Sequence, residues 1–181
     1  MTNVHGHTVD LSLIGDGSII DIGARGFEFA RYFSDKEVFC VDADPKVFVD
    51  YPPHVTIMNY AIAEENKEVT LYRNGEMTVL TDIYEGLEHE RFTVQGITMN
   101  DLYKMTGENI DLLKLDCEGA EYFIIGKDFR PVPKQISIEF HRHMYPDLHA
   151  KEFQNVLNIL FKDYYCAYFH ETLMDCLFVR K

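Results

Sequence analysis

Two features near the amino terminus have the residue types and spacing of a nucleoside site. Residues 21–26 read Asp-Ile-Gly-Ala-Arg-Gly, and Asp42 ends the next apolar run. Glycines in a strand-to-helix turn let the backbone approach a ligand, and the amino end of a helix attracts anions. A carboxylate at the end of the following strand can accept hydrogen bonds from both hydroxyls of a ribose. Together these features predict a nucleoside site, although an ordinary strand-to-helix turn would contain the same glycines.

The glycine spacing separates two kinds of nucleoside cofactor. A pyrophosphate cofactor such as NAD is typically bound by Gly-x-Gly-x-x-Gly. Gly23 and Gly26 supply only Gly-x-x-Gly, with Phe27 directly after them. S-adenosylmethionine has no phosphate and carries two cations, an ammonium and a sulfonium, which carboxylates such as Asp21 and Asp116 would suit. The sequence therefore favours methyl transfer over hydride transfer.

A third feature is the acidic group formed by Asp116, Glu118 and Glu121. Acids in a first helical turn stabilise the helix by about 0.3–1 kcal/mol each, which explains them without any site. Asp116, however, ends a buried strand and should face the same cleft as the glycine turn. Clustered carboxylates can also hold a divalent metal. Because no second acidic cluster lies at a convincing position, no metal is expected.

Glu139 and His141 are the candidate catalytic residues, with His143 two positions further on. Alternation would place the three side chains on one side of a strand if the strand continued. Methyl transfer to an alcohol needs a base near neutrality, for which histidine is suited, whereas a carboxylate acceptor needs only positioning. Solvent-exposed loop histidines are the alternative interpretation.

Three other polar residues are predicted to have no role in chemistry. His5 and His7 lie near the amino terminus and are expected to be flexible. Lys114 interrupts an apolar run, and its long side chain is expected to reach the surface.

Apolar runs and helical periodicities predict the elements that position these residues. Runs of continuous apolar residues that end in a carboxylate are typical of strands buried on both faces. The middle of the chain contains shorter, β-rich runs, and the last two runs are close enough to form a hairpin. The predicted strands are Ser18 to Ile22, Val38 to Val41, Val55 to Ala61, Glu68 to Tyr72, Met77 to Leu80, Arg91 to Thr98, Ile110 to Leu115, Gln135 to Phe140, Tyr164 to Phe169 and Met174 to Val179. The predicted helices are Phe27 to Phe33, Met99 to Met105, Gly119 to Ile125 and Ala150 to Phe161.

This alternation predicts an α/β fold with a doubly wound, mostly parallel sheet that ends in an antiparallel hairpin. Such sheets bind ligands beyond the carboxyl ends of their strands. No repeat, linker or low-complexity segment divides the 181 residues, so a single domain over residues 1–181 is expected.

Residues 110–121, IDLLKLDCEGAE, resemble the IDLLKIDVEGAE signature of the FkbM-type S-adenosylmethionine-dependent methyltransferases. The flanks at residues 21–26, 59–61, 97–102 and 138–141 fit the same family, so the resemblance covers roughly residues 18 to 143. It implies a Rossmann-like fold of the class I methyltransferase type. Two departures are Phe27, where the family commonly has glycine, and Asp42-Ala43, where a Glu-Pro pair is usual.

The resemblance also implies roles for individual residues. Gly23, Ala24 and Arg25 would line the methionine moiety, Asp42 would bind the ribose, residues 59–61 would lie near the adenine, and Asp116 and Glu118 would close the side of methyl transfer. The full predicted cofactor-binding set is Asp21, Gly23, Ala24, Arg25, Gly26, Asp42, Asn59, Ala61, Asp116 and Glu118.

Composition limits the partners. A net charge of −13 argues against binding nucleic acid or anionic lipid. No apolar run has the roughly 18 residues of a membrane span, and no leader segment opens the chain. Cys40, Cys117, Cys166 and Cys176 have no metal-binding spacing, which suggests thiols in a reducing cytoplasm; Cys166 and Cys176 could face each other across the terminal hairpin.

The sequence thus predicts a cytoplasmic S-adenosylmethionine-dependent methyltransferase that methylates a hydroxyl or carboxyl oxygen of a small molecule. A sheet with its helices uses nearly the whole chain, so the acceptor pocket must come from loops or from a second subunit in a homo-oligomer. The alternatives are a non-catalytic nucleoside-binding module of the same fold and, behind it, a nicotinamide-dependent oxidoreductase.

Overall fold

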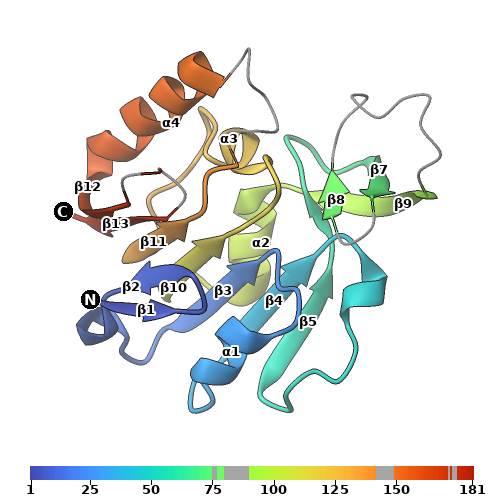
Figure 1. Ribbon diagram of the computed structural model, residues 1–181, viewed down its shortest axis with the longest axis horizontal. Coiled ribbons are helices and arrows are strands. Elements are labelled where there is room, and N and C mark those ends of the chain that lie inside the picture. The colour runs from blue at the N-terminus through green and yellow to red at the C-terminus, as the bar shows by residue number, and fades with distance from the viewer. Residues whose placement is uncertain (75–76, 80–89, 142–148, 171, 173–174) are drawn as a thin grey trace.

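A seven-stranded sheet forms the centre of the protein in a computed structural model that describes residues 1–74, 77–79, 90–141, 149–170, 172 and 175–181 (Figure 1). The strands lie in the order β12-β13-β11-β10-β3-β4-β5. Their bounds are β3 (Ser18–Ile22), β4 (Val38–Asp42), β5 (Val55–Asn59), β10 (Ile110–Leu115), β11 (Gln135–Ile138), β12 (Tyr164–Phe169) and β13 (Cys176–Arg180).

Five neighbouring strands of this sheet, from β5 to β11, are parallel, and β13 pairs antiparallel with both β11 and β12. The mixed α/β fold, the mostly parallel sheet and the closing antiparallel hairpin are therefore confirmed. In the hairpin register Cys176 lies opposite Phe169 rather than Cys166, so the two cysteines are not directly paired across the strands.

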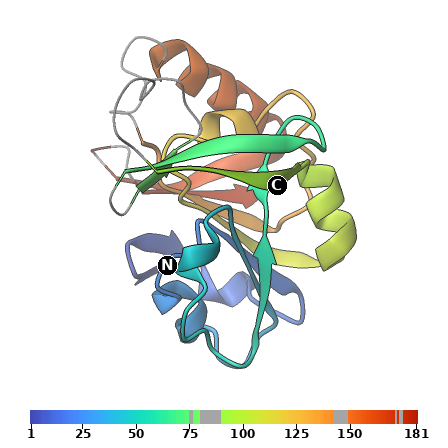
Figure 2. The same ribbon diagram turned by 90° about the vertical axis from the view of Figure 1, so that its right-hand side faces the viewer.

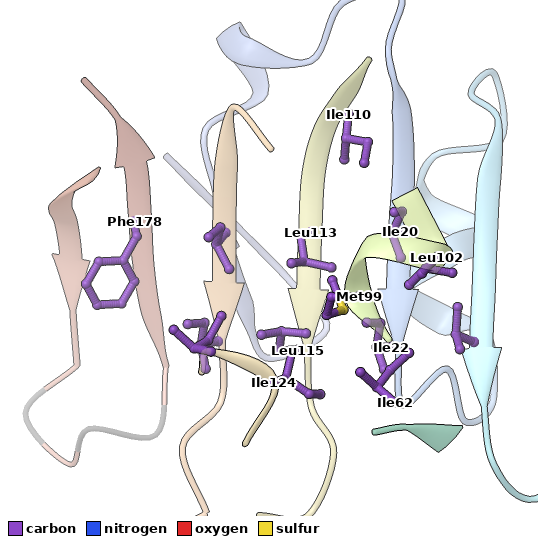
Figure 3. Packing of buried hydrophobic residues seen from close by; sticks show 14 of the residues in the cluster. Ile20, Ile22, Ile62, Met99, Leu102, Ile110, Leu113, Leu115, Ile124 and Phe178 are labelled. Atoms are coloured by element: carbon purple, nitrogen blue, oxygen red, sulfur yellow. The ribbon is translucent and has the colours of Figure 1, made fainter. Parts of the chain in front are cut away.

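Three of the four helices of the described residues cover one face of the sheet over its main core. The helices are α1 (Glu28–Tyr32), α2 (Met99–Thr106), α3 (Glu121–Ile124) and α4 (His149–Asp163), with short 3₁₀ turns at Leu11–Leu13 and Pro45–Val47. Figure 3 shows Met99 and Leu102 of α2 packed on Ile20, Leu113 and other strand side chains that point to the same face. In α4, Val156 and Leu160 are fully buried, as its predicted amphipathic pattern requires.

The opposite face is covered by α1 and by an amino-terminal hairpin that the sequence analysis did not predict. This hairpin pairs β1 (Thr2–Val4) with β2 (His7–Val9) through the turn His5-Gly6, in which both residues have positive φ. Asp10 and Gln135 exchange hydrogen bonds, and Thr8 donates to Asp175, so the hairpin is fixed to the sheet beside β11 and β13. Figure 1 shows it lying in front of the central strands.

The middle of the chain forms a second sheet of four strands in the order β6-β9-β7-β8. Its strands are β6 (Ala61–Ile62), β7 (Glu68–Asn74), β8 (Met77–Val79) and β9 (Glu90–Ile97), and Figure 2 shows them as a separate layer. The predicted strand from Val55 to Ala61 is therefore divided, because the chain leaves the central sheet at Tyr60. The short strands were predicted, but their assembly into a sheet was not.

The strand order reverses between β3 and β10. From β3 the chain runs outward through β4 and β5, and it then returns to β10 and continues to β11 on the other side. Ligands of open α/β sheets bind beyond the carboxyl ends of the strands at such a reversal.

Candidate functional site

A pocket lies at this reversal, between the carboxyl ends of β3, β4 and β10 and the second sheet. Its volume is about 160 Å³. The residues that line it are Ile22, Gly23, Arg25, Val41, Asp42, Ala43, Val47, Tyr60, Ala61, Ile62, Leu71, Asp116, Cys117, Glu118, Ala120 and Ile124. Among these described residues Arg25 is the one cation, against three carboxylates.

Gly23 joins the ends of three strands. Its φ is +81°, and a Cβ at this position would lie 1.7 Å from the carbonyl oxygen of Asp116. Its N–H donates to the carbonyl of Val41 at 2.9 Å. The glycine is therefore required for close packing of the turn against the end of β10, which brings Asp116 to the pocket wall.

Phe27 occupies the position where the family commonly has glycine, and it keeps the backbone conformation of a glycine. Its φ is +61°, in the left-handed region, and its side chain is only 1% exposed. The ring packs against Phe48 and Tyr51, away from the pocket lining. Burial of the ring stabilises the strained turn. Because the ring is not part of the pocket lining, phenylalanine in place of glycine does not obstruct the pocket.

Asp42 ends β4 at the pocket wall. Its Oδ1 accepts the N–H of Asp44 at 2.8 Å, and burial raises the pKa of the Asp42 carboxyl to about 6. The Asn59 amide donates to the carbonyls of Asp42 and Ala43, which holds this loop in place. Asn59 thus supports the pocket from behind and does not line it.

Lys114 is buried, so the prediction that it reaches the surface is wrong. The residue is 4% exposed, and its Nζ lies 2.9 Å from Asp21 Oδ1, 2.9 Å from the carbonyl of Gly23 and 3.4 Å from Asp116 Oδ2. Burial alone would lower the pKa of Lys114, but the charges of Asp21 and Asp116 outweigh it and raise the pKa above its usual value. Asp21, predicted to bind the cofactor, instead neutralises this lysine beneath the turn.

Glu121 organises the loop that follows β10. The side chain is fully buried and accepts the backbone N–H groups of Cys117 and Gly119 as well as a hydrogen bond with His141 Nδ1 at 2.9 Å. It is therefore more than a complement to the helix dipole. The hydrogen bond holds the loop that carries Glu118 next to the strand end that carries His141.

His141 is surrounded by carboxylates, which argues against its predicted role as a base. Its Nε2 lies 3.6 Å from Asp116, 3.6 Å from Glu118 and 3.9 Å from Glu139. Burial would lower the pKa of His141, but the hydrogen bond to Glu121 and the neighbouring negative charges raise it to about 9. At neutral pH the imidazole therefore carries a proton and cannot accept another.

Glu139 lies beside His141, just past the end of β11. Burial and the charge of Asp116 raise the pKa of the Glu139 carboxyl. Raised carboxyl pKa values suit a general base better than ordinary ones, so Glu139 is the better placed of the two predicted catalytic residues. His143 lies outside the described residues.

His7 is buried next to the pocket, against Asp116, so the prediction that it is flexible is wrong. It is 2% exposed, and its Nε2 lies 3.5 Å from Asp116 Oδ2. Its other ring nitrogen lies 3.4 Å from the hydroxyl of Ser137. For Asp116, burial would raise the pKa, but the interaction with His7 and the charge of Lys114 lower it below its usual range. Asp116 thus stays ionised at the point where the pocket and the histidines meet.

The structure brings most of the predicted cofactor-binding residues to the pocket. Six of them line it: Gly23, Arg25, Asp42, Ala61, Asp116 and Glu118. The other four lie behind the wall: Asp21 on Lys114, Ala24 in the core with α1, Gly26 in the turn and Asn59 on the loop after β4.

Local signals in the sequence could have revealed the residues that were missed. His5-Gly6 between Val4 and His7 is a two-residue turn of the kind that joins hairpin strands, because both positions take positive φ. Lys114 and Asp21 are charged residues within buried strands, and such residues are seldom buried without a partner of opposite charge.

Fold and site together define an α/β protein with an acidic ligand pocket at the carboxyl edge of a mostly parallel sheet. The Methyltransferase FkbM domain matches residues 21–169, and the chain belongs to this family of methyltransferases. No curated protein matches the chain at a significant level. Among the helices of the described chain, none is long and apolar enough to cross a lipid bilayer.

Proposed function

We propose that this methyltransferase uses S-adenosylmethionine and methylates an oxygen of a small-molecule hydroxyl or carboxyl. The observation that carries the proposal is the charge pattern of the pocket. Asp42, Asp116 and Glu118 line it together with Arg25. Three carboxylates suit a cofactor with an ammonium and a sulfonium, and a single guanidinium suits the one carboxylate of that cofactor.

A pyrophosphate cofactor would fit this pocket poorly. Its two negative charges would face three carboxylates. In dinucleotide folds the turn glycines clear space for the phosphates, whereas the space beside Gly23 is filled by the carbonyl of Asp116. The strand order, with β13 antiparallel between β11 and β12, supports a Rossmann-like sheet of the class I methyltransferase type.

Each part of the cofactor has complementary residues in the pocket. The ribose hydroxyls would donate to Asp42 at the end of β4, and Arg25 would bind the methionine carboxylate. Apolar side chains suited to an adenine ring come from the turn after β4, from the second sheet with the residue before it, and from α3: Val47, Tyr60, Ala61, Leu71 and Ile124. The pocket volume of about 160 Å³ is below the ~300–1,000 Å³ of typical ligand clefts and cavities. The cofactor would therefore extend through the pocket mouth.

In the proposed reaction the acceptor oxygen bonds to the methyl carbon, the sulfur keeps the electron pair of the broken bond, and the hydroxyl proton is released. The protein would contribute mainly alignment and exclusion of water. Glu139 is the candidate that accepts the proton from a hydroxyl acceptor. His141, held by Glu121, would neutralise the carboxylates around it.

A second function deserves a test because of His141. The neighbouring carboxylates raise the pKa of His141, which makes it a poor base, and a chain in which Glu139 did not take over this role would bind the cofactor without turnover, as a sensor. The proposal also includes a cytoplasmic location, which suits the free thiols of Cys40, Cys117 and Cys166. It further includes a second copy of the chain that completes the acceptor pocket.

Calorimetric titration with S-adenosylmethionine and with NAD tests the cofactor. We expect one S-adenosylmethionine bound per chain and no heat from NAD beyond dilution. Tight NAD binding would overturn the proposal. An enzyme should also release S-adenosylhomocysteine when it is offered a pool of small hydroxylated and carboxylated acceptors, whereas a sensor should bind without release.

The ionisation of Asp42 should make cofactor affinity depend on pH. Its raised pKa of about 6 means that the carboxylate form dominates above pH 6 and is lost as the pH falls below it. If the ribose binds the carboxylate, the Kd at pH 5 should be about tenfold weaker than at pH 8. Calorimetry at pH 5, 6, 7 and 8 measures this dependence.

Asp42→Asn is the matched variant for this prediction. It should bind about 10–100-fold more weakly at pH 8, because a hydrogen bond to a charged group is lost, and its affinity should change little between pH 5 and 8. Asp35→Asn, at an exposed position, should behave as wild type. An Asp42→Asn variant with wild-type affinity would show that the ribose lies elsewhere.

A further inference from the structure

Beyond the pocket, three side chains of metal-ligand type meet at Asp116. One ligand atom each from His7, Asp116 and Glu139 lies within 4.8 Å of the other two. His7 is buried, and the two carboxylates are partly buried. Asp116 also lines the cofactor pocket, whereas His7 and Glu139 do not, so the cluster lies on the other side of the Asp116 carboxylate.

The three residues come from distant parts of the chain and are held by rigid elements. His7 is on β2, whose hairpin is fixed by the Thr8–Asp175 and Asp10–Gln135 hydrogen bonds. Asp116 directly follows β10 and Glu139 directly follows β11, and these two strands are parallel neighbours. A set of ligands on strands and a fixed hairpin is pre-organised for binding.

The charge around the cluster favours an added cation. Five carboxylates gather here, on Asp21, Asp116, Glu118, Glu121 and Glu139. Lys114 and the two histidines supply at most three positive charges, whatever the protonation of the histidines. Lys114 Nζ lies 3.4 Å from Asp116 Oδ2, but it lies closer to Asp21 and to the Gly23 carbonyl, both at 2.9 Å, so its charge is shared. The cluster therefore keeps an excess of negative charge.

We propose that His7, Asp116 and Glu139 bind a divalent transition-metal ion. One imidazole and two carboxylates form a mixed nitrogen and oxygen set of the kind that Zn²⁺ and Mn²⁺ accept, whereas Mg²⁺ prefers oxygen alone. The Nδ1 of His7 lies 3.4 Å from Ser137 Oγ while Nε2 faces Asp116. A polar group on the far ring nitrogen is the usual support of a metal-bound histidine.

The competing occupant is the ammonium of the cofactor. An ammonium in the pocket can reach Asp116 and Glu118, which line it, but His7 and Glu139 are not part of that lining. An imidazole is also a common metal ligand and an unusual partner for an ammonium. The metal therefore accounts for all three residues, and the ammonium accounts for one of them.

The consequence for catalysis rests on the proposed function. A metal ion beside the methyl donor could bind the acceptor hydroxyl and lower its pKa, so that the proton is released to water before the oxygen attacks. A coordinated Glu139 would then be a ligand and not the base.

Calorimetry on the chelator-treated full chain with ZnCl₂, MnCl₂ and MgCl₂ tests the site. We expect one Zn²⁺ or Mn²⁺ per chain and weaker binding of Mg²⁺. His7→Gln and Glu139→Gln, which keep side-chain volume, should each weaken Mn²⁺ binding by about 100-fold or more, since loss of a supporting group already costs about 10–100-fold. Ser137→Ala, which removes the polar group next to His7 Nδ1, should weaken Mn²⁺ binding by only about 10–100-fold. His5→Asn is the matched control, because His5 is an exposed histidine on the same hairpin and asparagine tolerates its positive φ.

Electron paramagnetic resonance of Mn²⁺ on the wild-type chain gives a second measurement that needs no variant. Coupling to a histidine nitrogen is expected, and it should disappear in His7→Gln. Absence of one-to-one binding, binding unchanged in both glutamine variants, or Mn²⁺ with no nitrogen coupling would each overturn the metal site. Binding of S-adenosylmethionine by a metal-free chain would leave the proposed function intact, so the two failures are distinguishable.

Discussion

Gly23→Ala is expected to cost at least about 4 kcal/mol of unfolding free energy, or to prevent folding altogether. The left-handed backbone alone costs an alanine about 1–2 kcal/mol. The larger part comes from the Cβ, which would lie 1.7 Å from the Asp116 carbonyl, so β3 and β10 would have to separate. A total stability of about 5–15 kcal/mol leaves little reserve against such a change. Chemical denaturation followed by circular dichroism measures the loss.

Gly107→Ala provides the matched control. Gly107 has the same φ of +81°, but no atom lies within 4 Å of the Cβ that an alanine would add. With a ψ of 161° this backbone conformation is nearly confined to glycine, so the variant should lose only the backbone cost of about 1–3 kcal/mol. Equal losses in the two variants would show that packing of the turn on the end of β10 contributes nothing beyond the backbone conformation.

Lys114→Met is expected to destabilise the protein by about 3–5 kcal/mol, because it removes one partner of a buried ion pair. Asp21 is 1% exposed, and its carboxylate would lose the Nζ that lies 2.9 Å away. The Gly23 carbonyl would lose its hydrogen bond as well. The loss should appear as a lower denaturation midpoint with an unchanged slope.

A double variant separates the ion pair from packing. Asp21→Asn combined with Lys114→Met should be less destabilised than the sum of the two single variants, since no uncompensated charge remains. Lys104→Met, at an exposed position paired with Asp101, should change stability by less than about 1 kcal/mol. Additive losses, or a Lys114→Met loss as small as that of Lys104→Met, would contradict the buried-pair account.

The central strands could be predicted because each is apolar on both sides. β3, β4 and β10 lie between two layers, so their sequences are mostly apolar on both faces, and the carboxylate or glycine at the end of each marks where it leaves the core. Their carboxyl ends meet at one edge in any parallel sheet. For this reason Gly23, Asp42 and Asp116 could be assigned to one pocket before the structure was known.

The amino-terminal hairpin could not be predicted with the same method. Its strands have three residues each, too few to show the alternation of apolar and polar residues that indicates a strand. Its position depends on side chains 125 or more residues away, Gln135 and Asp175, which bind the backbone of β2 and its end. The second sheet was missed for a similar reason, since its pairing of β6 with β9 joins segments that carry no mutual signal in the sequence.

Local hydrophobicity and motifs of adjacent residues were sufficient to predict the central strands, the main helices, the family and the residues at the strand ends. The register between strands depends on contacts between distant segments and appears only in the assembled fold. Register places Lys114 opposite Asp21 and Ser137, and it leaves His7 above Ser137 and against Asp116. A charge that looks exposed in a sequence is buried when its partner lies on a neighbouring strand, and that pairing is fixed only when the whole sheet assembles.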